Sequence, residues 1–315
     1  MPRFSGPISK ECEKFIATKR AMGFKFITEA YIISVFDKYL LRLGALPNCL
    51  TKESVIEFAS KRESESDKSF SNRASLIRQF GIFMSKLGYD AYILPPFRTV
   101  KSSFVPYIYT QVELKRIFKV LDNLTEKFVF GKMRAKIYPV LFRILYGCGL
   151  RIGEATRLKV SDVDLISGYI VVRNAKHNSE RVVPMSESLR KVCRKYYNEM
   201  HSHGQNEYFF PSSDGGFLCS CAIYHQFKAI RKKHGLPLNG RIHDLRHTFA
   251  VHSLNKAVKN SEDISAFLPI LSKYLGHKNI AGTEKYLRLT AEIYPDITKL
   301  FEEHFGDVLP EVLDE

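Results

Sequence analysis

Apolar side chains recur every three or four residues through most of this 315-residue chain, and this spacing constrains its fold more than any other feature. The segment that starts at Thr28 carries Tyr31, Val35 and Tyr39 on one face and stops at Gly44. Such a stripe predicts an amphipathic helix whose aromatic residues pack in a core, and glycine is typical of the position after a helix. The chain is therefore expected to be mainly α-helical.

Four such helices are predicted in the first 90 residues, where no strand is indicated, and they should form a small bundle. Three prolines then interrupt regular structure, namely Pro95, Pro96 and Pro106. We therefore expect a helical bundle over residues 1–95, a linker over 96–106 and a larger domain over 107–300. In the larger domain, residues 168–173 and 181–184 are strand candidates joined by a polar turn, which predicts a small antiparallel sheet.

Positive charge dominates the composition, with 48 Lys and Arg against 33 Asp and Glu and a formal net charge of +15. This surplus favours a polyanionic partner, most simply nucleic acid. Basic residues on the predicted bundle are candidates for phosphate contact or for a solvated face: Lys19, Arg20, Arg73, Arg78 and Lys86. Residues 301–315 contain acidic residues and no Lys or Arg, so this tail should avoid DNA and is available to dock on protein. Disorder or packing on its own domain is the alternative.

The six cysteines form no C-x-x-C pair, and a disulfide framework is not expected in a chain of this size. No apolar run approaches the ~20 residues of a membrane span, and no apolar signal segment follows Met1. These features predict a cytoplasmic protein without a membrane partner, located where a bacterial chromosome would be.

Residues suited to phosphate chemistry follow one another along the larger domain. The segment 149–154 (GLRIGE) places Arg151 at a helix start with Glu154 three residues later, on the same face. His243 and Arg246 have the same spacing on a helix opened by Asp244, so they should project together. Arginine binds two phosphate oxygens at once and keeps its charge, and histidine moves protons near neutral pH.

Tyr286, nine residues after His277, is the candidate nucleophile among 16 tyrosines. A phenol attacks phosphorus only when a base or nearby cations relieve it of its proton. Tyr274, in a predicted packed helix, and Tyr294, in a turn, are rival nucleophiles. Lys176, in the polar turn between the predicted strands, has the chemistry to protonate a leaving 5′ oxygen.

Each candidate also has an ordinary structural interpretation. Arg151 with Glu154 reads as a surface ion pair, and a turn lysine is usually exposed to solvent. His247 and His252 flank the apolar run 249–251 and are interpreted as structural side chains. His243 and His247 have the spacing of a zinc-binding helix pair, but no clear third ligand follows, so a metal site is not expected.

Together these segments resemble the tyrosine recombinases, also called the phage integrase family. Residues 145–154 look like its first arginine box, and residues 243–249 are similar to its H-x-x-R box. Leu275-Gly276-His277 with Tyr286 matches the closing segment of the family, including the nine-residue step. The amino-terminal bundle resembles the core-binding domain (a SAM-like helical fold) by layout only, so the match covers roughly residues 145–290.

The resemblance implies an enzyme that cuts and rejoins DNA through a 3′-phosphotyrosine. The implied roles are nucleophile for Tyr286, phosphate binding for Arg151, Arg246 and His277, general acid for Lys176, general base for His243 and support for Glu154. Neither a cofactor nor a metal is implied, because the bond energy is kept in the phosphotyrosine. The implied partners are double-stranded DNA and three further copies of the chain, or sister recombinases, on two DNA sites.

Two departures from the family pattern refine the prediction. Arg246 and His277 are 31 residues apart, and the excess around residues 258–267 predicts a longer loop near the nucleophile helix. The turn of Lys176 reads Lys-His-Asn, where lysine followed by glycine is commoner. The extra residues and the sequence of segment 271–277 look more like those of a recombinase of a mobile element, of integrase or transposase type. A Xer-like dimer-resolving recombinase, a type IB topoisomerase and a non-catalytic DNA-binding regulator are the alternatives.

Overall fold

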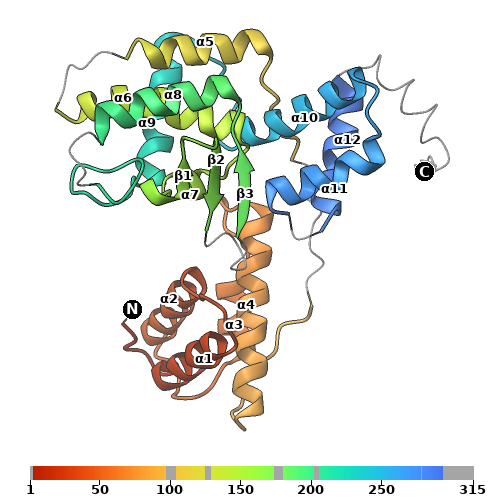
Figure 1. Cartoon of the computed structure of the whole chain (residues 1–315). Coiled ribbons are helices and arrows are strands. Elements are labelled where there is room, and N and C mark those ends of the chain that lie inside the picture. Colours follow the sequence, from red (N-terminus) through yellow and green to blue (C-terminus); the bar gives the residue numbers. More distant parts are fainter. Residues whose placement is uncertain are drawn as a thin grey trace. The chain divides into compact units, whose positions relative to one another are not determined.

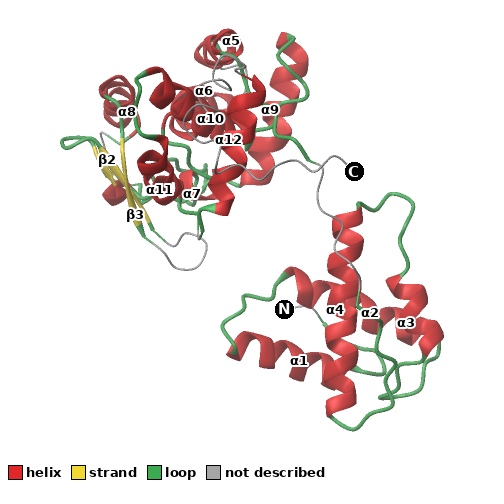
Figure 2. Cartoon of the chain, turned by 90° about the vertical axis from the view of Figure 1, so that its right-hand side faces the viewer, coloured by secondary structure: helices red, strands yellow, loops and turns green. Residues whose placement is uncertain are grey.

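The computed structural model describes residues 3–96, 104–124, 129–173, 180–201, 206–277 and 279–293. Within these residues the chain is mainly helical, with twelve α-helices, one short 3-10 helix and a three-stranded antiparallel sheet (Figures 1 and 2). The predicted fold class is confirmed. The chain separates into two compact units, Met1–Phe104 and Val105–Glu315. Lys176, most of the predicted linker and the whole acidic tail lie outside the described residues.

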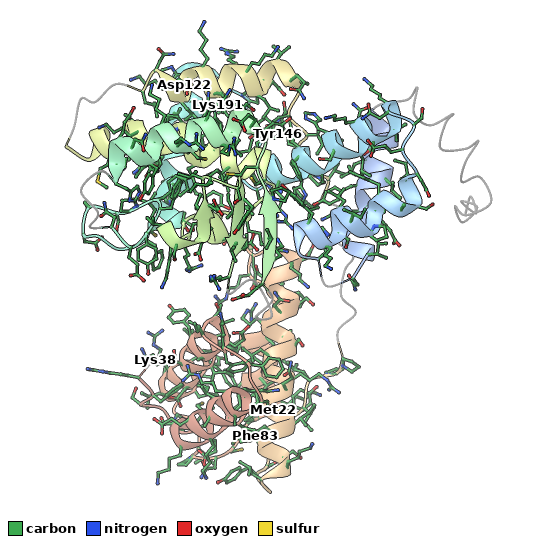
Figure 3. The ribbon with its side chains drawn as sticks, in the orientation of Figure 1. Met22, Lys38, Phe83, Asp122, Tyr146 and Lys191 are labelled. Atoms are coloured by element: carbon green, nitrogen blue, oxygen red, sulfur yellow. The ribbon has the colours of Figure 1, made fainter. Side chains whose placement is uncertain are left out.

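The first unit is a four-helix bundle around an aromatic core. Its helices are α1 (Ser9–Ala21), α2 (Thr28–Arg42), α3 (Lys52–Ala59) and α4 (Asp67–Lys86). Phe15, Phe36 and Phe80 are buried, and the rings of Phe15 and Phe80 meet edge-to-face at 5.3 Å. The buried Asp37 accepts hydrogen bonds from the backbone of Ser5 and Gly6, while the exposed Lys38 extends away from the bundle (Figure 3).

Arg73 does not lie on the outer face of this bundle, so its prediction as a surface residue is wrong. Its side chain is buried and forms an ion pair with Glu65. It also donates hydrogen bonds to the carbonyl oxygens of Phe58 and Ser60. A buried guanidinium group needs such partners because its charge has lost water. Arg73 therefore joins α4 to the end of α3.

The second unit contains the remaining elements. They are α5 (Gln111–Asp122), α6 (Val129–Gly147), α7 (Ile152–Ala155), η1 (Val160–Asp162), β1 (Val163–Asp164), β2 (Tyr169–Val172), β3 (Arg181–Pro184), α8 (Glu187–Met200), α9 (Ser220–His234), α10 (Asp244–Lys259), α11 (Ile264–Leu275) and α12 (Ala281–Ile293). The sheet order is β1-β2-β3, with Ile170 opposite Val183. No helix among the described residues is long and apolar enough to cross a membrane.

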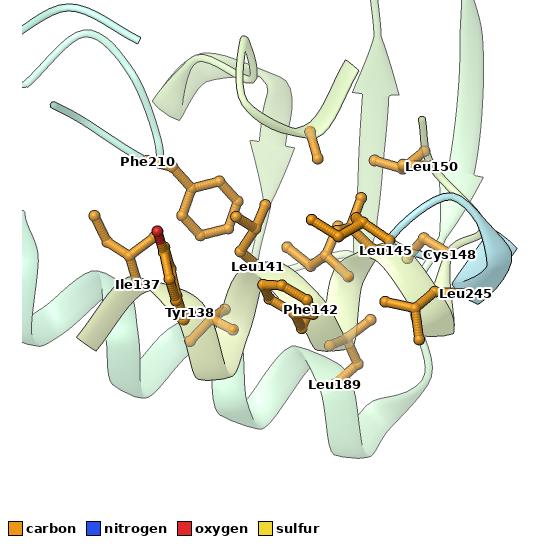
Figure 4. Close-up of a cluster of buried hydrophobic side chains, with 14 of the residues drawn as sticks. Ile137, Tyr138, Leu141, Phe142, Leu145, Cys148, Leu150, Leu189, Phe210 and Leu245 are labelled. Atoms are coloured by element: carbon orange, nitrogen blue, oxygen red, sulfur yellow. The ribbon is translucent and has the colours of Figure 1, made fainter. Parts of the chain in front are cut away.

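Helix α6 lies at the centre of this unit and packs against α5, α8 and α10. Its apolar residues continue into the following loop, where Cys148 and Leu150 are fully buried beside Leu145 and Leu245 (Figure 4). Burial of a leucine side chain stabilises a fold by roughly 2 kcal/mol. Because Leu150 is anchored in this core, the backbone of the next residue, Arg151, is held in place.

The predicted long loop near residues 258–267 is wrong. Helix α10 continues to Lys259 and α11 already begins at Ile264, so only four residues connect the two helices. Asp263 starts α11 by accepting hydrogen bonds from the backbone of Ser265 and Ala266. The residues between Arg246 and His277 therefore lie mainly in α10 and α11.

Candidate active site

Four segments of the second unit lie side by side and carry the candidate residues. They are the turn into α7, the start of β3, the first turn of α10, and the end of α11 with the following helix α12. Hydrogen bonds between residues more than 90 positions apart join all four segments. Figure 1 shows α10, α11 and α12 grouped together, with α11 next to β3. The candidate residues that the structure describes are thus brought together by tertiary packing.

Glu154 binds two arginines at once. Its carboxylate accepts from the Arg151 side chain at 2.7 Å and from the two terminal nitrogens of Arg181 at 2.8 and 3.2 Å. Burial alone would raise the pKa of Glu154, but the hydrogen bonds and charge of Arg181, with those of Arg151, lower it from 4.5 to about 2. Arg151 lies at the start of a helix, as predicted, and this helix is the four-residue α7.

Three arginines share the backbone carbonyl groups at the end of α11. Arg181 donates to Tyr274 at 2.8 Å, Arg246 to Leu275 at 2.5 Å and Arg151 to Gly276 at 3.2 Å. The last carbonyl groups of a helix have no partner inside the helix and carry partial negative charge, so cations suit them. These contacts fix the turn that presents the next residue, His277.

Gly276 has a left-handed backbone conformation with φ +66°, and a Cβ atom there would lie 2.9 Å from Nη1 of Arg181. A Gly276→Ala substitution should therefore strain the backbone and displace Arg181. We expect a loss of stability of about 1–2 kcal/mol. Urea unfolding at neutral pH would measure it, with Gly215→Ala as control. Gly215 also has positive φ but has no neighbour within 4 Å of its Cβ position, so an equal loss in both variants would exclude the contact as the cause.

Arg246 is the most deeply buried of these cations, with 2% of its surface exposed. It donates to the carbonyl oxygens of Gly149 at 2.7 Å and Leu275, so one guanidinium group bridges the arginine box and the end of α11. Burial and the nearby charge of Arg151 lower the pKa of Arg246 to about 10. The group stays protonated at neutral pH and keeps its charge in a poorly solvated place.

Tyr286 lies on α12 with its ring buried. Its hydroxyl group is 2.8 Å from Nδ1 of His247, and the ring of His247 meets the ring of His243 edge-on at 4.8 Å. Burial raises the pKa of Tyr286, while the charges of Arg246 and Arg151 oppose that rise. Burial is also the main reason why the pKa of His243 falls to about 4 and that of His247 to about 3. Both histidines are therefore neutral at pH 7.

His277 lies against the same tyrosine. Its ring stacks on that of Tyr286 with a centroid distance of 6.1 Å, and its Nδ1 is 2.7 Å from Oγ1 of Thr283. Burial, together with the charges of Arg246 and Arg151, lowers the pKa of His277 to about 4. A groove of about 1050 Å³ is lined in part by Arg151, Arg181 and His277, and it is large enough for a phosphodiester.

The rival tyrosine Tyr274 has a structural role. Its hydroxyl group donates to the carbonyl oxygen of Pro184, and its ring stacks on that of Phe249. Tyr294, like Lys176, lies outside the described residues. His252 pairs through Nδ1 with Tyr146 at 3.0 Å, in agreement with its structural interpretation.

Two residues of this site, Arg181 and His247, are not among the site residues predicted from the sequence. Arg181 follows the polar turn directly, where a strand-opening arginine gives no signal of its partners, and His247 was interpreted as structural. The H-x-x-x-H spacing of His243 and His247 placed them on one face, and this spacing was the available signal. In the described part of the chain, no group of three or more His, Cys, Asp and Glu side chains is arranged to hold a metal ion.

Comparisons with known proteins show the family to which this chain belongs. The family model described as "Phage integrase family" matches residues 108–292. Putative integrase/recombinase y4rB of Sinorhizobium fredii is 29% identical over 94% of this chain and 97% of its own length. Tyrosine recombinase XerC of Oceanobacillus iheyensis is 30% identical over 82% of this chain and 84% of its own length.

Solved structures share the fold. XerH site-specific recombinase bound to a palindromic difH substrate has a TM-score of 0.64 and 19% identity, covering 87% of this chain and 79% of that chain. The Tn1549 transposon integrase in complex with a circular intermediate DNA has a TM-score of 0.62 and 19% identity, covering 88% and 94%. With the family match over more than half of its length, this chain belongs to the phage integrase family and is a site-specific tyrosine recombinase.

Proposed function

We propose that this recombinase cuts and rejoins DNA for a mobile element, as an integrase or transposase, with Tyr286 as the nucleophile. The observation that carries the catalytic assignment is the convergence of two guanidinium groups and the ring of His277 around Tyr286. The mobile-element role is supported by similarity to a putative integrase/recombinase over nearly the whole chain. The transposon integrase named above shares the fold.

In the proposed reaction, Arg151, Arg246 and His277 bind the non-bridging oxygens of the scissile phosphate. Tyr286 attacks phosphorus, a 3′-phosphotyrosyl bond forms, and the strand with the 5′ oxygen leaves. Cations aimed at the developing charge are the largest contribution that such a site can make. Glu154 orients Arg151 in this reaction, a role that its hydrogen bonds to the backbone and side chain of Arg151 support. Lys176 serves as the general acid for the leaving oxygen, and His243 contributes as a general base.

Strand exchange requires a second DNA site. We propose that four protomers, alone or with sister recombinases, assemble on two duplexes in the bacterial cytoplasm. The phosphotyrosyl bond keeps the energy of the broken phosphodiester, so a 5′ hydroxyl group of the partner duplex restores it by attacking the same phosphorus atom. A λ integrase dimer bound to a core site is among the structures with this fold.

Covalent capture tests this proposal. The protein is recovered from its own cells under denaturing conditions, and any attached DNA is sequenced, with Tyr286→Phe as control. We expect DNA from one short sequence, lost in the variant, because phenylalanine has no oxygen to bind phosphorus. Attached DNA from the whole genome would instead indicate a type IB topoisomerase. Failure to attach even to nicked substrates, from which the cut strand cannot return, would indicate a DNA-binding regulator.

A further inference from the structure

The hydroxyl group of Tyr286 is paired with His247 rather than with the first histidine of the H-x-x-R box. His247 Nδ1 lies 2.8 Å from this hydroxyl group, whereas His243 contacts the ring of His247. Both partners of this hydrogen bond are almost completely buried, with 5% of His247 and 1% of Tyr286 exposed. The hydrogen bond is therefore shielded from water, which would otherwise compete for the phenol proton.

The charge around the hydroxyl group favours loss of its proton. Arg246 and Arg151 both act on Tyr286 electrostatically and oppose the rise that burial causes in its pKa. A neutral imidazole has one nitrogen with a proton and one with a free lone pair. In the tautomer protonated at Nε2, Nδ1 of His247 accepts the phenol proton along the existing hydrogen bond. The two neighbours thus form a nucleophile and base pair within hydrogen-bonding distance.

We propose that His247 is a further catalytic residue, whose Nδ1 takes the proton of Tyr286 when its oxygen attacks the scissile phosphate. This inference rests on the proposed function of Tyr286. It changes one assignment in that mechanism, since the proton acceptor is the second histidine of His243-Asp244-Leu245-Arg246-His247. His243 then supports the imidazole ring of His247 through their edge-on contact.

The step balances without a cofactor. The bond between Tyr286 Oη and phosphorus forms, the bond between phosphorus and the 5′ oxygen breaks, and the phenol proton moves to Nδ1 of His247. The leaving 5′ oxygen takes a proton from the general acid. In the joining step, a 5′ hydroxyl group attacks phosphorus and gives its proton back to the general acid. The bond between phosphorus and Tyr286 Oη breaks, and His247 returns its proton to the departing phenol oxygen.

The bound DNA itself should strengthen this acceptor. Burial is the main cause of the low pKa of His247, and the charges of Lys285 and Arg246 lower it further. The negative charge of a phosphodiester held by the two arginines would offset those positive charges. His247 would therefore become more basic when substrate is present and stay neutral in the DNA-free protein.

The first arm of the test compares His247→Asn and His247→Ala with the wild-type protein. Asparagine keeps a hydrogen-bond acceptor near the position of Nδ1 but cannot take up a proton at neutral pH. Single-turnover cleavage of a nicked substrate bearing the captured site should fall by ~10²–10⁴-fold in both variants. His252→Asn is the matched control, because His252 lies on the same helix and pairs with Tyr146. It should cleave at nearly the wild-type rate.

The second arm removes the need for Tyr286. A DNA strand that carries a p-nitrophenyl ester on its 3′ phosphate is offered to proteins that carry Tyr286→Ala, with or without His247→Asn. A 5′-hydroxyl strand displaces p-nitrophenolate, which leaves as a stable anion and needs no proton. The two proteins should join this strand at rates within a few-fold of each other, because binding of the phosphate does not require His247.

Three results would overturn the inference. Full cleavage by His247→Asn would show that an acceptor is needed only to hold Tyr286. Faster cleavage by either variant would show that His247 restrains the nucleophile. An equal fall in the cleavage rate of the first arm and in the joining rate of the second arm would show that His247 supports the phosphate site. Failure of the proposed function is recognised separately, because the wild-type protein would then form no covalent bond between Tyr286 and DNA.

Discussion

Replacement of Arg246 by lysine is expected to slow DNA cleavage by about a thousandfold while leaving DNA binding largely intact. The guanidinium group of Arg246 bridges the carbonyl oxygens of Gly149 and Leu275, and it is the most deeply buried cation beside Tyr286. A lysine keeps the charge but has one nitrogen, so it cannot bridge both carbonyl groups and also present a fork to phosphate. Loss of one hydrogen-bond donor aimed at developing charge typically lowers the catalytic rate by ~10²–10³-fold. In Arg246→Lys, the fixed orientation of the cation is lost as well.

Single-turnover cleavage of the captured DNA site, at saturating protein, would measure this effect. Arg241→Lys is the control, since it makes the same chemical change five residues earlier. Arg241 is half exposed and forms an ion pair with Asp244. We expect the control to cleave within a few-fold of the wild-type rate. Retention of cleavage within tenfold in Arg246→Lys, with an unchanged thermal unfolding midpoint, would contradict a role of Arg246 at the phosphate.

Replacement of Glu154 by glutamine is expected to destabilise the second unit by roughly 3 kcal/mol at neutral pH. The carboxylate joins Arg151 and the buried Arg181, and the pKa of Glu154 is lowered from 4.5 to about 2. Glutamine has one acceptor oxygen, so it cannot accept from both arginines as the carboxylate does. The NH₂ group of its amide would face the N–H donors of a guanidinium group. Removing one partner of a buried ion pair is costly because the remaining charge is left without compensation.

The pH dependence of this difference has a defined sign. The carboxyl group has a lower pKa in the folded protein than in the unfolded chain, so its ionised form stabilises the fold above about pH 4.5. That contribution is lost as the pH falls from about 4.5 towards 2. Urea unfolding of the wild-type protein and Glu154→Gln should therefore differ most at pH 7 and converge in acid. The control is Glu187→Gln in the exposed Arg190 pair, which should change little, and a difference independent of pH would contradict the assignment.

Local spacing in the sequence was sufficient for much of the fold and for several members of the site. Helical periodicity predicted a mainly α-helical chain, and the two strand candidates form the β2–β3 hairpin. The three-residue step from Arg151 to Glu154 predicted a pairing on one face, which is found at 2.7 Å. Such contacts lie within one helical turn, so the covalent chain itself limits the distance between the residues.

Contacts between distant segments could not be read in this way. Arg181 reaches Tyr274 across 93 residues, and His247 reaches Tyr286 across 39. Neither position differs in the sequence from an ordinary strand-opening arginine or a histidine beside an apolar run. The buried position of Arg73 and the helical path of residues 258–267 were likewise decided by packing.

The sequence by itself determined the helical class, the order of the catalytic motifs and the family, because these depend on residue type and on spacing along the chain. Only the tertiary structure decided which arginine meets which carbonyl group at the end of α11, and which histidine meets Tyr286. The physical reason is that each of these partners is selected by burial. A charge or hydroxyl group that has lost water must bind whatever polar group the packed helices place beside it.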